Sequence, residues 1–300
     1  MHIFMTGPTG YIGAPLAQSL LDRGHSVTGL ARSAEAADTL AARGLQAHQG
    51  DTAEPESISD ILPQVDAVIH IAVGLPRGVT ETDFAFTDKL IQGLAGTGKP
   101  LIMTSGLGVY AGIADAYVDE TTPLAPAIEM QAMRVKLEDR VLAASAQDIR
   151  SIVLRPAHVY GQGGAGTLVR TLLGAAAESK KGAFIGDGIV PVSTVHVDDL
   201  VAAYIAALDR GRGGQLYNLV SDRVYMRDLA KAVSHATGGN GDTVSLTAQE
   251  AQSKWGPIAA LYGASPIISG TRAIVELGWK ATAPSALYEL VHGSLRVNAA

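Results

Sequence analysis

The sequence predicts an α/β fold, a Rossmann-type doubly wound parallel sheet with a smaller C-terminal lobe. Short apolar strands and helical stretches alternate up to about residue 155, and such alternation is typical of a parallel sheet covered by helices on both faces. A glycine cluster at residues 7–13 separates the first strand from the first helix. From about residue 218 the alternation gives way to short mixed elements with many turns. Right-handed crossovers between the strands then give the doubly wound order.

Each expected element is marked by its own residues. Apolar runs predict the strands, and Gly24 and Gly44 predict where the first two helices stop. Pro15 is tolerated because it falls early in its helix, where a missing amide costs little. The expected strands are residues 2–6, 26–30, 45–48, 66–70, 101–104 and 151–155. The expected helices are one that ends at residue 23 and those over residues 34–43, 80–95 and 127–146.

Composition restricts the class of protein. The 300 residues include 23 Lys and Arg and 29 Asp and Glu, a net charge of −6, which argues against a nucleic-acid or anionic-membrane partner. No cysteine is present, so disulfides, thiolate catalysis and cysteine-ligated metals are excluded. The first residues lack the features of a signal peptide, and no run of 18 apolar residues is available to span a bilayer. We expect a cytoplasmic protein.

The glycine cluster predicts a dinucleotide site. A Gly-x-x-Gly-x-x-Gly pattern begins at the end of a strand and opens a helix, the context in which backbone amides and the positive end of the helix bind a pyrophosphate. An ordinary glycine-rich turn is the alternative. The contacts expected from this loop are Gly7, Thr9, Gly10, Tyr11, Ile12 and Gly13.

The end of the second strand predicts which dinucleotide binds. An acidic residue there favours NAD, whereas this chain has Arg32 and Ser33, which suit the 2′-phosphate of NADP. Arg32 on a solvated loop is the alternative. NADP is therefore the expected cofactor, with NAD less favoured. The next two strand ends contribute the expected contacts Asp51, Thr52, Ala72 and Val73.

We expect two interleaved parts. Residues 1–155, completed by about 186–217, form the dinucleotide-binding domain. Residues 156–185 and 218–300 form a smaller substrate-binding lobe that closes over the sheet. The glycine-rich residues 161–166 predict a flexible loop, either a lid over the substrate or a passive linker.

Further motifs follow along the chain. They are Thr-Ser-Gly-Leu-Gly-Val-Tyr at residues 104–110, Leu-Arg-Pro at 154–156, Val-His-Val-Asp-Asp-Leu at 195–200 and Leu-Gly-Trp-Lys at 277–280. With these motifs and the glycine cluster, the chain resembles an extended short-chain dehydrogenase/reductase of the NAD-dependent epimerase/dehydratase superfamily. The resemblance covers nearly the full length and implies Thr104 and Pro156 as further cofactor contacts.

The resemblance also implies a catalytic Ser or Thr and a Tyr-x-x-x-Lys pair, in which the tyrosine transfers a proton and the lysine lowers its pKa. No Tyr-x-x-x-Lys occurs in this chain. If Glu138 is the glutamate that follows the family's lysine by four, Arg134 replaces the lysine and Met130 the tyrosine. If Lys136 is the lysine, Ala132 replaces the tyrosine. In both alignments the phenolic proton donor is missing.

Three residues remain as catalytic candidates. Ser105 lies one position before the family's Ser or Thr, which is Gly106 here, and it could instead bond backbone. Arg134 could bond the nicotinamide ribose and face an oxyanion, or form a surface ion pair with Glu138. His158 follows the sixth strand and could replace the missing acid, or be structural.

Other motif positions are expected to be structural or to narrow the substrate. The arginine that grips sugar nucleotides in relatives is Val192 here, and the acidic pair of sugar dehydratases is replaced by Leu107 and Gly108. Tyr110 and Tyr160 are expected to pack with bonded hydroxyls. Asp198 and Asp199 are expected to cap a helix that begins near Leu200, rather than to bind a metal with His196.

These observations predict an NADP-dependent oxidoreductase or isomerase that acts on a small, non-nucleotide carbonyl or alcohol. A catalytically silent NADP(H)-binding sensor or scaffold is the alternative, because the tyrosine is missing. A sugar-nucleotide epimerase is a third, weaker possibility. The resemblance further suggests a homodimer built on the helices at residues 80–95 and 127–146.

Overall fold

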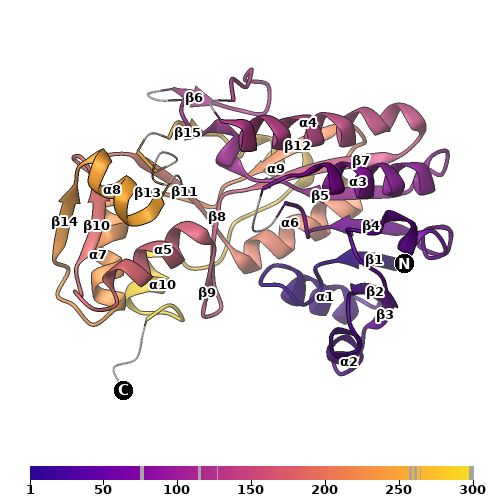
Figure 1. Cartoon of the computed structure of the whole chain (residues 1–300), viewed down its shortest axis with the longest axis horizontal. Coiled ribbons are helices and arrows are strands. Elements are labelled where there is room, and N and C mark those ends of the chain that lie inside the picture. Colours follow the sequence, from indigo (N-terminus) through magenta and orange to yellow (C-terminus); the bar gives the residue numbers. More distant parts are fainter. Residues whose placement is uncertain are drawn as a thin grey trace.

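The computed structural model describes residues 1–74, 78–113, 116–126, 128–256, 259, 262–263 and 265–296. A parallel sheet of seven strands, in the order β12-β7-β5-β4-β1-β2-β3, lies at its centre (Figure 1). The predicted doubly wound Rossmann-type sheet is therefore confirmed. Its strands are β1 (His2–Thr6), β2 (Ser26–Ala31), β3 (Gln46–Gln49), β4 (Ala67–His70), β5 (Pro100–Thr104), β7 (Arg150–Pro156) and β12 (Gln215–Leu219).

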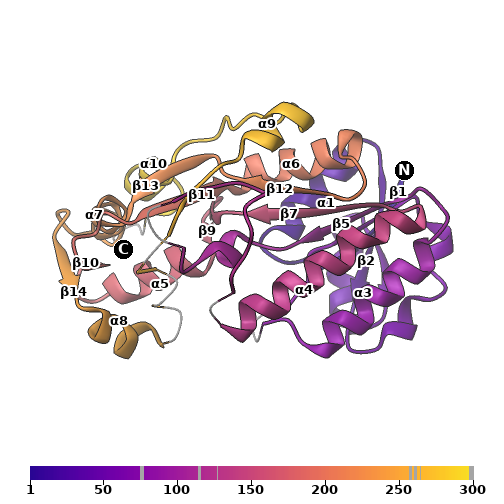
Figure 2. The same ribbon diagram turned by 90° about the horizontal axis from the view of Figure 1, so that it is seen from above.

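Helices cover both faces of this sheet (Figure 2). The side chains of β1 show how the two cores divide: Ile3 and Met5 pack on one face and Phe4 on the other, because successive side chains of a strand point to opposite faces. The helices on the face of Ile3 are α1 (Gly13–Asp22), α2 (Ala34–Ala41), α6 (Val197–Arg210) and α9 (Thr271–Leu277). Those on the face of Phe4 are α3 (Glu81–Leu94) and α4 (Glu129–Ala143). None of the helices described is both long enough and apolar enough to cross a membrane.

The observed boundaries lie close to the predicted ones. The helix predicted over residues 127–146 is α4 followed by the 3-10 turn η4 (Ala144–Gln147), and residue 127 lies outside the described residues. Three more 3-10 turns join elements of this domain: η1 (Pro55–Ile58), η2 (Leu62–Gln64) and η3 (Leu107–Tyr110).

The smaller lobe has its own sheets and its own apolar core. A four-stranded sheet in the order β13-β11-β8-β9 is built from β8 (His158–Gly161), β9 (Gly164–Ala165), β11 (Pro191–His196) and β13 (Asp222–Tyr225). Two strand pairs accompany it, β10 (Gly182–Ile185) with β14 (Thr243–Leu246) and β6 (Tyr117–Val118) with β15 (Ile267–Ile268). The helices are α5 (Thr167–Ala176), α7 (Met226–Ala236), α8 (Ala248–Trp255) and α10 (Ala286–Val291).

The loop predicted at residues 161–166 is instead a hairpin between β8 and β9. Tyr11, from the glycine loop, donates its hydroxyl hydrogen bond to the carbonyl oxygens of Gly161 and Gly164, both at 2.8 Å. Gly163 N donates to Ser294 Oγ at 2.9 Å. The hairpin is therefore attached to both parts of the molecule.

Candidate active site

The glycine loop has a shape that only glycine permits. Gly7 has φ +69°, and a Cβ on Gly13 would lie 2.0 Å from the carbonyl oxygen of Gly7. Gly10 N donates to that same oxygen at 3.1 Å, which closes the turn. Within the described chain no side chain caps α1, and its first turn holds no acidic residue. The positive end of this helix is thus open to an anion, and the loop fits a pyrophosphate.

The other predicted contacts of the loop differ in their exposure to solvent. Thr9 and Gly10 are exposed, while Ile12 lines a cavity described below. The Tyr11 hydroxyl is occupied by the β8–β9 hairpin. The proton of the Tyr11 hydroxyl is therefore used within the protein, where it holds the loop against the hairpin.

The predicted adenosine end of the site lies beyond β2 and β3. Arg32 is exposed, as a phosphate-binding guanidinium must be before binding. Ser33 caps α2, because its Oγ accepts a hydrogen bond from Ala36 N at 3.2 Å. Asp51 Oδ1 accepts from Ala53 N at 2.9 Å, so its carboxylate orders its own loop, and the Thr52 hydroxyl donates to the same oxygen at 3.4 Å.

Beyond β4 the chain is held by a buried hydroxyl. Thr6 Oγ1 accepts hydrogen bonds from the amides of Ile71 and Ala72, each at 3.1 Å, and it lies 2.8 Å from His70 Nδ1. The side chain of Val73 is buried against a cavity. Ala72 and Val73 thus lie at the carboxyl end of the sheet, where dinucleotides bind in such folds.

The His70 network carries a prediction on acid stability. Burial lowers the pKa of His70 to about 4 from its ordinary 6.5, so between these values the unfolded chain binds a proton that the folded chain does not. The free energy of unfolding should therefore fall as the pH drops from about 6.5 to about 4, with a slope of about 1.4 kcal/mol per pH unit for this histidine. Guanidinium unfolding between pH 7 and pH 5 measures it. The variant His70→Asn should flatten the slope and His292→Gln, an exposed histidine, should not; equal slopes in all three proteins would contradict the assignment.

A cavity of about 320 Å³ joins the two lobes at the carboxyl ends of the central strands. Most of its wall is apolar, with a few polar side chains, which is the usual make-up of a small-molecule site. It brings together seven residues that the sequence predicts for the site: Ile12, Val73, Thr104, Ser105, Arg134, Pro156 and His158. Thr104 Oγ1 is already bonded to the hydroxyl of Tyr204 at 2.5 Å.

Ser105 presents a free hydroxyl to this cavity. Its backbone amide donates to Leu154 O at 2.7 Å, which fixes the residue at the end of β5. Its Oγ is buried and has no hydrogen-bond partner within the described part of the chain. Because a buried polar atom without a partner costs free energy, this oxygen is suited to bond a ligand.

The two residues that could replace the lysine of the missing Tyr-x-x-x-Lys lie in different surroundings. Arg134 lines the cavity, and its Nη2 donates to Val73 O at 3.2 Å, whereas Lys136 is exposed. Of the two residues that could replace the lysine, Arg134 is therefore the one at the cavity, and in that alignment Met130, which is 47% exposed, falls at the tyrosine position. The alternative ion pair of Arg134 with Glu138 is wrong, because Glu138 pairs with Arg155 instead.

His158 lines the cavity with its ring edge-to-face against Tyr262, at 6.1 Å between centroids. Burial lowers the pKa of His158 to about 4. The imidazole is therefore neutral at neutral pH, and we do not expect it to act as a charged acid there.

A buried polar network supports the wall of the cavity. The side chains of Glu138 and Arg155 are 1% and 5% exposed, and Arg155 Nη1 donates to the hydroxyl of Tyr110 at 2.8 Å. Tyr110 ends η3, whose Leu107 and Gly108 line the cavity. Sequence reasoning missed this network, although it singled out the motifs that contain its members.

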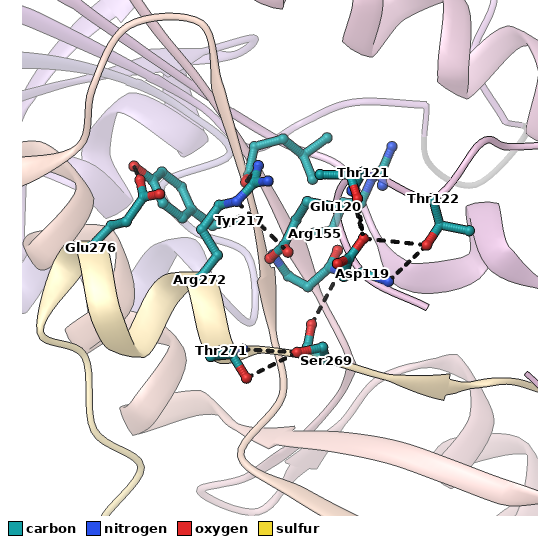
Figure 3. Close-up of polar contacts among 12 residues, drawn as sticks. Asp119, Glu120, Thr121, Thr122, Arg155, Tyr217, Ser269, Thr271, Arg272 and Glu276 are labelled. Carbon is teal, nitrogen blue, oxygen red and sulfur yellow. Dashed lines mark hydrogen bonds and ion pairs between the residues drawn. The ribbon is translucent and has the colours of Figure 1, made fainter. Parts of the chain in front are cut away.

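The network continues away from the cavity through Asn218, whose amide group bonds Tyr110 and whose backbone N donates to Glu120 Oε1 at 2.9 Å. Arg272 lies on the other side of Glu120, with Nε 3.9 Å from Oε2 (Figure 3). Burial raises the pKa of Glu120.

The hydroxyls of Tyr110 and Tyr160 are both bonded, as the sequence predicts. The Tyr110 hydroxyl donates to Asp119 O at 2.9 Å, and the Tyr160 hydroxyl donates to Pro284 O at 2.8 Å.

The Asp198-Asp199 pair is not the cap that the sequence predicts. Helix α6 begins at Val197, and its cap is His196, whose Nδ1 accepts from Asp198 N at 3.1 Å. Asp199 Oδ1 instead accepts from the backbone amides of Thr282 and Ala283. The described residues contain no cluster of His, Asp and Glu that could hold a metal.

Comparison with known proteins identifies the family of the chain. Residues 3–219 match the NAD dependent epimerase/dehydratase family. The chain is 27% identical over 296 residues to an uncharacterized protein of Schizosaccharomyces pombe, which covers 97% of this chain and 98% of that protein. It is 27% identical over 234 residues, 73% of this chain and 68% of the relative, to the 4-hydroxy-2-methyl-3-oxo-4-farnesyl-3,4-dihydroquinoline-1-oxide ketoreductase of Stigmatella aurantiaca.

Among solved structures, UDP-glucose 4-epimerase of Thermotoga maritima with UDP-glucose superposes with a TM-score of 0.79 at 20% identity, covering 98% of this chain and 97% of that one. This likeness shows the fold. The family match spans more than half of the chain and includes the glycine loop, the Ser105 strand end and Arg134. The chain belongs to the NAD-dependent epimerase/dehydratase family.

Proposed function

We propose that this protein is an NADP-dependent oxidoreductase that reduces a small, non-nucleotide ketone or aldehyde, or oxidises the matching alcohol. The observation that carries the proposal is the free hydroxyl of Ser105, which shares a small, mostly apolar cavity with the guanidinium of Arg134 next to the glycine loop. The ketoreductase named among the relatives supports the reaction type. Val192 packs in the core of the smaller lobe where sugar-nucleotide enzymes carry an arginine, which argues against a nucleotide sugar.

The glycine loop at Gly7, Gly10 and Gly13 would hold the pyrophosphate of NADPH, which when bound would supply the hydride for the substrate carbon. Ser105 donates a hydrogen bond from Oγ to the substrate oxygen, and Arg134 places its positive charge where that oxygen becomes negative. Met130 offers no proton, and His158 is neutral, so a water molecule admitted to the cavity would supply the proton: Ser105 gives its hydroxyl proton to the substrate oxygen as it takes one from that water. The apolar wall keeps bulk water away and so strengthens both interactions.

Consumption of NADPH, followed by absorbance over a panel of small ketones and aldehydes, tests the proposal. We expect turnover with several small substrates and none with UDP-sugars. Tight NADPH binding without consumption for any compound would contradict it. That outcome would favour the silent NADP(H)-binding protein, for which the exposed Met130 at the tyrosine position is the supporting observation.

The preference for NADP rests on Arg32. Removing a guanidinium that bonds a phosphate typically weakens binding about 10- to 100-fold. We therefore expect Arg32→Ala to weaken NADPH binding by about that factor and to leave NADH binding unchanged. Calorimetric titration with both dinucleotides measures this. Arg43→Ala, an exposed arginine beyond the end of α2, is the matched control and should change neither affinity. Equal losses for both dinucleotides would remove Arg32 from the 2′-phosphate site.

A further inference from the structure

The cavity has a second polar wall, on the smaller lobe. Ser193 on β11 lines the cavity, is 4% exposed, and its Oγ has no hydrogen-bond partner among the residues described. Its strand neighbour Thr194 differs, because Thr194 Oγ1 donates to Asp222 O at 3.3 Å. A buried hydroxyl left without a partner lowers stability, so its retention on a cavity wall points to a ligand.

The amino terminus of α5 lies on the same wall. Gly166, the cap residue, and Thr167, the first residue of this ten-residue helix, line the cavity. No described side chain caps the terminus, and its first turn contains no acidic residue. The first amides of a helix have no partner within it, and the helix dipole makes this end positive.

Backbone contacts connect the helix terminus to the strand that carries Ser193. Gly166 N donates to Val159 O at 2.7 Å, so the start of α5 rests on β8. Strand β8 pairs with β11, where His158 lies opposite Thr194, the residue next to Ser193. This wall faces the cavity from the four-stranded sheet, whereas Ser105 and Arg134 face it from the seven-stranded sheet and its helix α4.

The charges around the cavity favour an anion. None of the described residues that line it is acidic, and Arg134 is the one charged side chain among them. We propose that Ser193 and the amino terminus of α5 form a carboxylate subsite, and that the substrate is a small oxo carboxylate whose ketone oxygen meets Ser105 and Arg134. The inference deepens the proposed function and rests on it for the second half of this statement.

Matched ligands separate the carboxylate subsite from ketone recognition. The probes are 4-oxopentanoate and 5-oxohexanoate, their methyl esters, and the corresponding ketones without the acid group. Two readouts are used: kcat/KM for NADPH consumption, and Kd in the dead-end complex with NADP⁺, measured by calorimetry. We expect the wild-type protein to prefer at least one acid over its ester by about tenfold or more in both readouts, since a charged hydrogen-bonded group gains most from this wall.

Two variants test the subsite residue by residue. Ser193→Ala should weaken binding of the acid about tenfold and leave the ester nearly unchanged. Thr167→Asp should weaken binding of the acid by a similar factor, because the two carboxylates repel each other. The same substitution should stabilise the start of α5, where a negative charge is favourable. Neither variant should lower the melting temperature of the free protein, because one removes an unpartnered hydroxyl and the other improves a helix end. Ser221→Ala is the matched control, because its hydroxyl is bonded to Thr194 O and lies outside this cavity.

The outcomes distinguish the inference from the proposed function. Ser193-dependent binding of the acid in the dead-end complex, without NADPH consumption, would keep the subsite and overturn the reductase. Turnover with acid, ester and ketone alike would keep the reductase and overturn the subsite. Failure of all probes to bind, or equal losses for acid and ester in Ser193→Ala, would also overturn the subsite.

Discussion

Replacing Glu138 by alanine is expected to lower the free energy of unfolding by about 3–5 kcal/mol, because it leaves the charge of Arg155 buried without a partner. Arg155 Nε lies 3.0 Å from Oε1 and Nη2 lies 2.5 Å from Oε2, so one edge of the guanidinium holds both oxygens of the carboxylate. Both side chains are almost completely removed from solvent. Denaturant unfolding monitored by circular dichroism measures the loss.

Two further variants make this test specific. Asp139→Ala, an exposed carboxylate on the same helix, should change the free energy of unfolding by less than about 0.5 kcal/mol. The double variant Glu138→Leu with Arg155→Met should recover much of the loss, since an apolar pair replaces a buried ion pair at little cost. A single-variant effect no larger than that of Asp139→Ala would show that the pair does not support the fold.

Replacing Arg134 by methionine is expected to lower kcat/KM for carbonyl reduction by about 10²–10³-fold, the usual effect of removing a group that stabilises a developing oxyanion. The reason is that no other cationic side chain among the described residues lines the cavity. Arg134→Lys keeps the positive charge but loses the planar guanidinium with its paired donors. Its kcat/KM should therefore lie between the values of the wild-type protein and of Arg134→Met. Steady-state kinetics at saturating NADPH measures these differences.

The control for Arg134 is two residues away on α4. Lys136→Met removes an exposed charge and should leave kcat/KM within about twofold of the wild-type value. If Lys136→Met proves as damaging as Arg134→Met, the other alignment of the missing motif is the correct one. If neither variant affects turnover, the oxyanion is stabilised elsewhere.

Features that depend on neighbouring residues in the chain could be predicted from the sequence. The turn at Gly7 and the alternation of Ile3, Phe4 and Met5 between the two cores follow from local geometry, and the structure shows both. Arg134 could be found because its spacing from Glu138 matches a family pattern. These signals need no knowledge of distant contacts.

Features that depend on distant contacts could not be predicted. An ion pair of Glu138 with Arg134 along their helix is one of the two roles that the sequence allows for Arg134, but the fold brings Arg155 from β7 to Glu138, and these two side chains form a buried pair. The cap of α6 was assigned to aspartates because aspartate is a frequent cap, whereas the end of β11 places the His196 ring there. Ser193 is a candidate because its buried hydroxyl has no hydrogen-bond partner among the described residues. A sequence alone cannot indicate which buried hydroxyls lack a partner.

The Tyr11 bridge has a consequence for building chimeric proteins from this family. One phenol from the nucleotide loop bonds two carbonyl oxygens that lie 150 and 153 residues further along the chain. A Cβ on Gly164 would lie 2.4 Å from the Tyr11 ring, so any other residue at 164 collides with it. The glycine loop and the β8–β9 hairpin therefore fit each other. A chimera designed to change cofactor preference should take both segments from the same parent protein.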